Sequence, residues 1–405
     1  MTNVMERWGL TPVINAAGTM TSLGASRVSP EVRAAVDDVL GRFVKISELH
    51  ALANRAIRAA TGAEAGYVTA SSSAAITLAV AAALTGDDLA AIEALPATGA
   101  RQRRVAVMMS HMVNYGGSIP QAIAAAGAEV VALGTAALCE TYHLEAAIRE
   151  GLAAAVYVVS HHTVREGELP MDLFVSICRA NGLPVIVDMA SEYDLTAAAG
   201  LGADAVIWSG HKFLGGPTSG IVAGQSAMIR AMVLQNRGLG RLMKAGKEAI
   251  VGAVAALEAW GTRDHAAEAA REAVIVAGWL AALDGLPGIT ANPHRDWTGN
   301  PITRVKLKLS PQAGLHAWEL AERAMARNPA VALRDDLSMH QLIFLDPCNV
   351  TGAEAVLVSD CIRQICDAAR GSGDGLQRSW SEEKAARGRE ATDWIGGDWI
   401  GGDGA

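Results

Sequence analysis

The sequence is poor in aromatic residues and carries no excess of positive charge. Phenylalanine, tyrosine and tryptophan together make up 4% of its 405 residues. Lysine and arginine number 34 against 42 aspartates and glutamates, which gives a formal net charge of −8 and a pI near 5.7. Because proteins that bind nucleic acid usually carry a basic face, this balance argues against a nucleic-acid partner.

Long hydrophobic runs and paired cysteines are missing as well. The mainly apolar stretch 74–84 is far shorter than the roughly 20 residues of a membrane-spanning helix. The first ten residues, MTNVMERWGL, lack the basic and apolar regions of a signal peptide. The five cysteines never occur as C-x-x-C, which speaks against a disulfide framework or a zinc site. We expect no membrane partner, no metal and a cytoplasmic location.

The sequence does contain enough apolar residues for a large core, since 51% are hydrophobic and 19% charged. Seven short apolar runs alternate with alanine-rich helical segments. Continuous apolar strands separated by helices are typical of a mainly parallel sheet covered on both faces. The pattern predicts an α/β domain with a seven-stranded sheet. The runs are 66–70, 105–109, 129–133, 154–159, 184–188, 205–208 and 220–224.

The pattern changes after about residue 250, where residues 250–283 indicate one or two long helices. Residues 303–310 then alternate apolar and polar side chains, which predicts a half-buried antiparallel strand in a smaller α+β domain. We expect a large domain at 45–260, a connecting helix at 261–284 and a small domain at 285–370. The segment 1–44 should pack with the small domain, and 371–405, which ends in DWIGGDWIGGDGA, should be a mobile tail.

Two residues at strand ends suggest the chemistry. Asp188 ends a buried run, and Lys212 follows the next run in the sequence S-G-H-K. Open α/β sheets bind ligands at the carboxyl ends of their strands, where a half-buried lysine becomes a nucleophile. A lysine and an aspartate placed there suit pyridoxal 5'-phosphate (PLP), because the lysine can bond its aldehyde and the aspartate its ring nitrogen. Taken singly, Lys212 would more often be a surface loop lysine, and Asp188 a strand-end aspartate that caps a helix.

The surrounding motifs resemble a known family. An aspartate at a strand end, then S-G-H-K followed by G-G-P-T-S-G at 215–220, is similar to the selenocysteine-synthase-like branch of fold-type I PLP enzymes. The resemblance is closer to the D-glucosaminate-6-phosphate ammonia-lyases and covers most of the chain. Further matching segments lie at 11–24, 61–79, 110–117, 160–163 and 238–248. The resemblance implies the fold-type I architecture, PLP as the cofactor and a homodimer or an assembly of dimers.

The resemblance also suggests a phosphate site. Three serines precede the apolar helix at 74–84, and the free N–H groups of a helix N-terminus favour phosphate. An ordinary N-cap would look similar. Ser209 and His211 could add phosphate contacts, and the resemblance implies that Thr218 reaches the phosphate in a neighbouring subunit. The three serines are Ser71, Ser72 and Ser73.

Three histidines belong to the expected site. The resemblance implies that His111 stacks on the cofactor ring. It also implies that His161 or, preferably, His162 approaches the ring's phenolic oxygen or the substrate hydroxyl, where it could act as a general acid.

The basic segment 228–248 indicates either a solvated face or an anion-binding wall. Arg241 and Lys244 would share a face of a helix there. Arg334, in the small domain, suits the substrate carboxylate, and a surface ion pair is the alternative. Where relatives tend to carry an arginine, this chain has Cys348, which weakens the case for a phosphorylated sugar acid.

The sequence therefore predicts a PLP-dependent lyase that removes water and ammonia from a β-hydroxy amino acid or amino sugar acid. Racemase, aldolase or β-replacement chemistry, as in selenocysteine synthase, shares the same first step and stays open. A non-enzymatic PLP-binding scaffold is the remaining alternative. Bacterial selenocysteine synthases carry an N-terminal tRNA-binding domain, which we do not expect here because the matching core begins at Thr11.

Overall fold

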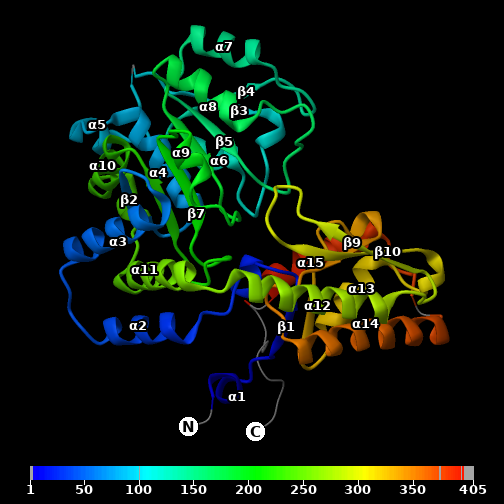
Figure 1. Ribbon diagram of the computed structural model, residues 1–405. Coiled ribbons are helices and arrows are strands. Elements are labelled where there is room, and N and C mark those ends of the chain that lie inside the picture. Colours follow the sequence, from blue (N-terminus) through cyan, green and yellow to red (C-terminus); the bar gives the residue numbers. More distant parts are fainter. Residues whose placement is uncertain (1–2, 100, 374, 394, 396–405) are drawn as a thin grey trace. The chain divides into compact units, whose positions relative to one another are not determined.

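The computed structural model describes residues 3–99, 101–373, 375–393 and 395 (Figure 1). The chain divides into two compact units. The large unit is Ser26–Arg263, and the small unit combines the described residues of 1–25 and 264–405. Each unit is built around its own core and is described separately below.

The large unit is built on a seven-stranded sheet in the order β2-β8-β7-β6-β5-β3-β4. Every neighbouring pair is parallel except the two that β8 makes with β2 and β7. The expected fold class, a mainly parallel α/β sheet, is confirmed. The strands are β2 (Ala65–Thr69), β3 (Arg104–Met108), β4 (Glu129–Leu133), β5 (Ala154–Val158), β6 (Val185–Asp188), β7 (Ala205–Ser209) and β8 (Gly220–Gly224).

Helices cover both faces of this sheet, which is why the strands are mainly apolar. Successive side chains point to opposite faces, so Val206 joins one apolar cluster and Ile207 the other. One face packs against α3 (Ile46–Thr61), α7 (Thr141–Glu150), α8 (Met171–Ala180), α9 (Ala197–Gly200) and α11 (Lys247–Thr262). The other packs against α4 (Ser72–Thr85), α6 (Ile119–Ala124) and α10 (Ser226–Leu234). Helices α2 (Pro30–Leu40) and α5 (Leu89–Ala94) complete the unit.

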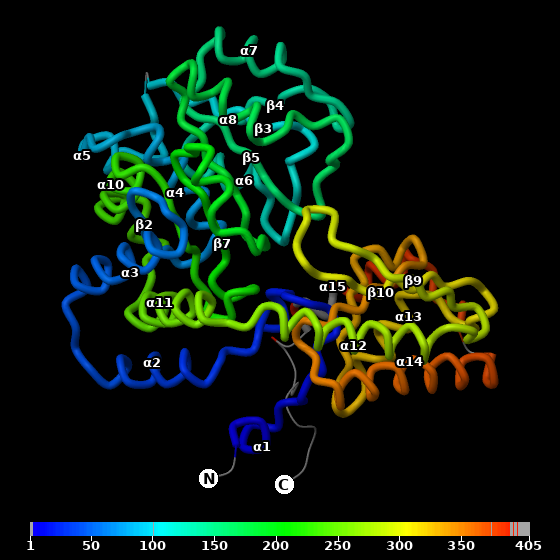
Figure 2. The backbone as a smooth tube through the Cα atoms, in the orientation of Figure 1, coloured from blue at the N-terminus to red at the C-terminus, as the bar shows by residue number. Residues whose placement is uncertain are grey.

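The small unit contains two short sheets. Strands β1 (Val13–Ala16) and β11 (Ala330–Leu333) form a parallel pair. Strand β10 (Thr303–Leu309) lies between β9 (Ile289–Arg295) and β12 (Leu342–Leu345) and is antiparallel to both, as its alternating pattern predicts. The helices α12 (His265–Leu283) and α14 (Gly352–Ser372) lie side by side (Figure 2). Helices α1 (Val4–Trp8), α13 (Ala317–Met325) and α15 (Trp380–Asp393) belong to the same unit.

The boundaries differ from the expected ones in two places. Residues 26–44 belong to the large unit, because α2 packs along α11. The expected tail from residue 371 includes the end of α14 and the helix α15, whose polar sequence has no apolar stripe to signal it. Most of the repeat at 393–405 lies outside the described residues. Within the described ranges, no helix has the length and apolar character needed to cross a membrane.

Candidate active site

The parallel strands of the large unit end at one edge of the sheet, and the predicted lysine and aspartate lie there. Asp188 is the last residue of β6 and stands in register between Val158 of β5 and Ile207 of β7. Ser209 ends β7, and Lys212 follows three residues later. The strand register therefore accounts for the convergence of these residues from distant parts of the sequence.

Asp188 is buried, with 3% of its surface exposed. Burial raises the pKa of its carboxyl to about 6, although the nearby charge of Lys212 and the N–H of Ala190 oppose the rise. The Ala190 N–H donates to Asp188 Oδ1 at 3.1 Å, which fixes the carboxylate at the strand end. A buried carboxylate beside a cation is suited to pair with a second positive group, such as a protonated ring nitrogen.

Lys212 is half-buried on a tight turn that follows β7. Its Nζ donates to Ser191 Oγ, and its backbone oxygen accepts from Ser26 Oγ at 2.6 Å. The turn closes through Gly210, whose N–H donates to the Ser219 oxygen at 2.9 Å. A side chain at position 210 would overlap Ser219 Oγ, so the turn requires glycine there. Ser191 thus holds the ammonium group, and Ser26 and the turn hold the backbone of Lys212.

The three serines occupy the start of α4, as expected. Ser71 is the N-cap, and its Oγ accepts from the Ala74 N–H at 3.0 Å. Ser72 and Ser73 form the first turn, where backbone N–H groups have no intrahelical acceptor. Gly220 of β8 approaches so closely that a Cβ would overlap the backbone oxygen of Ser71. The N-terminus of α4 is therefore a narrow site whose first-turn backbone N–H groups have no acceptor within the helix.

A second group of polar atoms lies at the end of β7. Ser209 and His211 are both buried, and Ser209 Oγ is 3.1 Å from His211 Nδ1. His211 Nε2 is buried and has no hydrogen-bond partner among the described residues. A buried orphan nitrogen costs free energy unless a ligand satisfies it. Burial and the charge of Lys212 lower the pKa of His211. Thr218 is exposed on the following turn.

These residues fit PLP. The group needs an amine for its aldehyde, a carboxylate for its ring nitrogen and donors for its phosphate. The large unit provides Lys212, Asp188, the first turn of α4 and the orphan nitrogen of His211. These side chains and N–H groups therefore match the aldehyde, the ring nitrogen and the phosphate of PLP in their chemistry.

His111 does not fit its expected place. Its side chain has no exposed surface, and both ring nitrogens are engaged. Nδ1 accepts from the Val158 N–H at 3.1 Å, so the proton lies on Nε2, 3.0 Å from Glu168 Oε2. The ring also meets Tyr157 edge-on at 4.6 Å. The structure therefore contradicts a stacking role on the cofactor, because the imidazole is a buried link between β5 and the loop that carries Glu168.

Tyr115 and Ser191 are site residues that the sequence did not reveal. Burial and the charges of Asp188 and Glu192 raise the pKa of the Tyr115 hydroxyl, and a hydrogen bond with Ser160 partly offsets this rise. Its ring lies 5.6 Å from that of His162, and the rings of His161 and His162 lie 4.0 Å apart. Tyr115 stands in the matched segment 110–117, which was the only available signal.

The basic segment is not the single helix that the expectation assumed. Arg241 lies in the 3-10 helix η4 (Leu239–Met243), which ends before Lys244, so the two do not share a helical face. Both side chains are exposed. Lys247 has a structural role instead, because its Nζ donates to the backbone oxygens of Leu40 and Arg42.

Arg334 belongs to the small unit. It is buried, its Nε donates to Asp336 Oδ2 at 2.9 Å, and its backbone forms a bridge with Phe344. Arg334 thus makes an ion pair with Asp336, and its role towards the substrate carboxylate stays a prediction. Cys348 lies in the same unit, where its N–H donates to Asp346 Oδ1 at 3.0 Å. Burial and the charge of Asp346 raise the pKa of its thiol.

The fold and the lysine–aspartate site define the class of the protein. It is a fold-type I PLP-dependent enzyme. The solved structure of ureidoglycine–glyoxylate aminotransferase from Bacillus subtilis shares this fold, with a TM-score of 0.61 at 12% identity over 94% of this chain and 98% of that one.

The chain belongs to the SelA family, because the family model "L-seryl-tRNA selenium transferase" matches residues 13–277. Curated relatives above 30% identity include the two that follow. D-glucosaminate-6-phosphate ammonia lyase of Salmonella typhimurium (strain 14028s / SGSC 2262) is 37% identical over 91% of this chain and 99% of its own. The 5'-C-glycyluridine monooxygenase-decarboxylase of a Streptomyces species is 34% identical over 82% of this chain and 84% of its own. A solved D-glucosaminate-6-phosphate ammonia-lyase superposes with a TM-score of 0.81 at 36% identity, covering 91% of this chain and all of that one.

Proposed function

We propose that the protein removes water and then ammonia from an amino sugar acid or a related β-hydroxy amino acid. The Cα–H and Cβ–OH bonds break, and water leaves. The released enamine takes up water and loses ammonia, which yields a 2-keto acid. The observation that carries the proposal is the likeness to an ammonia-lyase along nearly the whole chain, with the lysine and aspartate at adjoining strand ends.

The large unit provides the groups for proton transfer. PLP, when bound, supplies an electron sink for negative charge at Cα of an amine substrate. Lys212 is placed to take the Cα proton on Nζ, and Ser191 Oγ holds that nitrogen in position. Asp188 holds a positive charge on the ring nitrogen, which its burial makes favourable. His162, beside Tyr115, would donate a proton to the departing hydroxide.

We assign the phosphate of PLP to Ser72, Ser73, Ser209 and His211, with Ser71 as the N-cap that orders the turn and Thr218 as a donor to a neighbouring subunit. The buried orphan nitrogen of His211 supports this assignment. His111 is left out of the catalytic set because its ring is enclosed.

Substrate anions would be bound by arginine and lysine side chains. Arg334 is assigned to the substrate carboxylate, because a guanidinium binds a carboxylate through two parallel hydrogen bonds. Arg241 and Lys244 are assigned to an anionic group farther along the substrate. Cys348, in place of a relative's arginine, favours a substrate less anionic than a 6-phosphosugar acid.

The deciding experiment offers the purified enzyme D- and L-β-hydroxy amino acids and amino sugar acids, each with and without a phosphate. Keto acid and ammonia should appear in equal amounts, and Lys212→Ala should abolish both. An epimer, an aldehyde or a replacement product without ammonia would instead establish the racemase, aldolase or transferase alternative. Cofactor absorbance without any turnover would leave only a PLP-binding scaffold.

We further propose a cytoplasmic homodimer. The connection between α2 and α3 exposes Leu40 at the end of α2, Phe43 in the loop and Ile46 at the start of α3, with Phe43 fully accessible. Apolar side chains gathered at one exposed connection mark an interaction surface. The five free cysteines, of which only Cys348 is not fully buried, accord with a reducing compartment.

A further inference from the structure

The turn that carries Lys212 is bound by a guanidinium from the end of α11. Arg263 directly follows this helix, and its Nη1 donates to the Phe213 oxygen at 2.9 Å. Its Nη2 donates to the Leu214 oxygen at 3.3 Å. Phe213 and Leu214 are the two residues that follow Lys212 in the chain. A single planar side chain therefore holds the backbone on the carboxyl side of the lysine.

Arg263 is itself held by an aromatic cluster. Its guanidinium carbon lies 4.9 Å from the centre of the Trp260 ring, an arrangement in which cation and ring attract each other. Trp260 is buried, and its ring meets that of Tyr193 edge-on at 5.1 Å. The Tyr193 ring also lies 4.2 Å from that of Phe213. Because Trp260 restricts the guanidinium, its two hydrogen bonds cost less side-chain freedom than they would on an open surface.

The same cluster reaches the loop that binds the amine of Lys212. Tyr193 lies two residues after Ser191 on the loop that follows β6, and Ser191 Oγ accepts from Lys212 Nζ. The contact of Tyr193 with Phe213 joins this loop to the lysine turn. The backbone and the amine of Lys212 are therefore held by one connected set of side chains, which all belong to the large unit.

We propose that Arg263 is a positioning residue for Lys212. By binding the Phe213 and Leu214 oxygens, it keeps the turn, and with it Lys212 Nζ, in the place from which the Cα proton of the substrate is taken. A displacement of about 1 Å at such a group can slow a reaction by about 100-fold. The inference rests on the proposed function, which assigns this proton transfer to Lys212.

The test compares Arg263→Ala with the parent holoenzyme. The kcat should fall by roughly 10- to 100-fold while KM stays within about twofold, because proton transfer slows and substrate binding is retained. Substrate with deuterium at Cα should then show a full primary isotope effect on kcat, because breaking the Cα–H bond limits turnover. The visible circular dichroism per bound PLP should decrease, because the lysine holds the cofactor in a less defined orientation.

Two further variants separate positioning from general stability. Arg263→Lys retains the positive charge but lacks the planar fork that reaches both oxygens, so kcat should fall about threefold to tenfold. This variant carries the test alone if Arg263→Ala does not hold PLP. Arg179→Ala is the matched control, because Arg179 Nη1 also donates to a backbone oxygen of the large unit, that of Leu201, at 3.0 Å. Its kcat and circular dichroism should equal those of the parent.

Three outcomes would overturn the inference. A kcat within about twofold of the parent in Arg263→Ala or Arg263→Lys would show that Lys212 does not need the paired hydrogen bonds. A lower kcat without a full isotope effect, together with parental circular dichroism, would show that Arg263 does not act on the proton transfer. An equal loss in Arg179→Ala would mean that the removal of any such arginine contact slows turnover.

Lys212→Ala separates this inference from the proposed function. Exchange of the substrate's Cα proton in deuterated water reports the proton transfer whatever the final product is. If the parent exchanges this proton without releasing keto acid and ammonia, the proposed reaction is wrong, and the exchange rate of Arg263→Ala still tests the positioning role. If Lys212→Ala exchanges the proton as fast as the parent, another group transfers it, and the role of Arg263 is lost as well.

Discussion

The charge of Asp188 is controlled by its burial. Its pKa is about 6 against an ordinary value of 3.8, so between these values the folded protein binds more protons than the unfolded chain. The free energy of unfolding of the cofactor-free protein should therefore fall as pH rises through this range. Above the folded pKa, Asp188 is ionised in both states and the free energy of unfolding no longer changes with its titration. Asp188→Asn should stabilise the cofactor-free protein at pH 8 by up to about 3 kcal/mol, which urea unfolding would measure.

The same substitution should abolish catalysis. An amide cannot hold a positive charge on the ring nitrogen, so turnover should fall by about 100-fold or more although PLP still binds. Asp172→Asn, at an exposed carboxylate on α8, is the matched control and should change neither property. Near-normal turnover of Asp188→Asn would mean that another group pairs with the ring.

The residue that binds the cofactor covalently can be identified by chemical labelling. Borohydride reduction of the yellow holoenzyme should fix PLP to Lys212, because its amine lies at the carboxyl edge of the sheet beside Asp188. Peptide mapping by mass spectrometry would locate the modified lysine. Recovery of the label on a peptide without Lys212 would contradict the assignment.

At the scale of elements, the close approach of β8 to α4 shapes the proposed phosphate site. Gly220→Ala would push a methyl group into the backbone oxygen of Ser71 and displace the first turn of α4. We expect PLP to bind roughly tenfold more weakly, as a cofactor titration followed by absorbance would show. Gly261→Ala, in α11 with open space around it, should leave PLP affinity unchanged. Equal affinities in both variants would place the phosphate elsewhere.

The exposed segment around η4 separates the substrate classes. If Arg241 and Lys244 bind a distal phosphate, truncating either should weaken binding of the phosphorylated substrate by about one to two decades, since a charge-assisted contact contributes roughly 1.5–3 kcal/mol. The loss should shrink for the dephosphorylated analogue, which KM values for both substrates would show. Parental KM values throughout would identify the segment as a solvated face.

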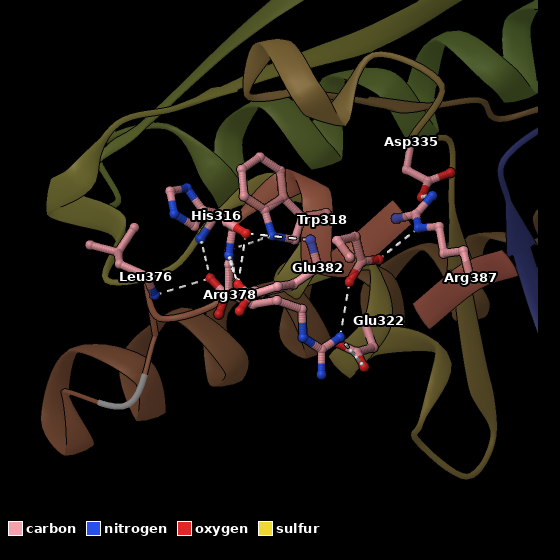
Figure 3. Close-up of polar contacts among 11 residues, drawn as sticks. His316, Trp318, Glu322, Asp335, Leu376, Arg378, Glu382 and Arg387 are labelled. Carbon is pink, nitrogen blue, oxygen red and sulfur yellow. Dashed lines mark hydrogen bonds and ion pairs between the residues drawn. The ribbon is translucent and has the colours of Figure 1, made fainter. Parts of the chain in front are cut away.

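Whether an element could be predicted depended on how it is buried. The sheet strands are mainly apolar, so runs such as 129–133 and 220–224 agree with the observed strands residue for residue. Strand β9 has mostly accessible side chains and includes Pro293, and it escaped prediction. Helix α15 docks through ion pairs (Figure 3), which leave no periodic pattern in a single sequence.

At the scale of the whole molecule, the exposed apolar loop predicts self-association. Phe43→Ser should shift the protein from dimer towards monomer in analytical ultracentrifugation, because it removes the most accessible apolar side chain of the loop. Tyr142→Ser, an exposed aromatic residue on α7, is the control and should leave the mass unchanged. A parental mass in Phe43→Ser at micromolar concentration would mean that the loop is not the interface.

The sequence by itself determined the fold class, the cofactor and the lysine–aspartate pair. Apolar runs mark strands, and parallel strands end at one edge, so Asp188 and Lys212 could be placed at the same edge. The resemblance of the surrounding motifs to a known family then indicated the cofactor. Tertiary structure decided the rest. The enclosure of His111 by Val158 and Glu168, the contact of Lys212 with Ser191, and the pairing of Arg387 with Asp335 all join distant residues. Such contacts depend on where the chain returns in space, and periodicity along the sequence carries no record of that.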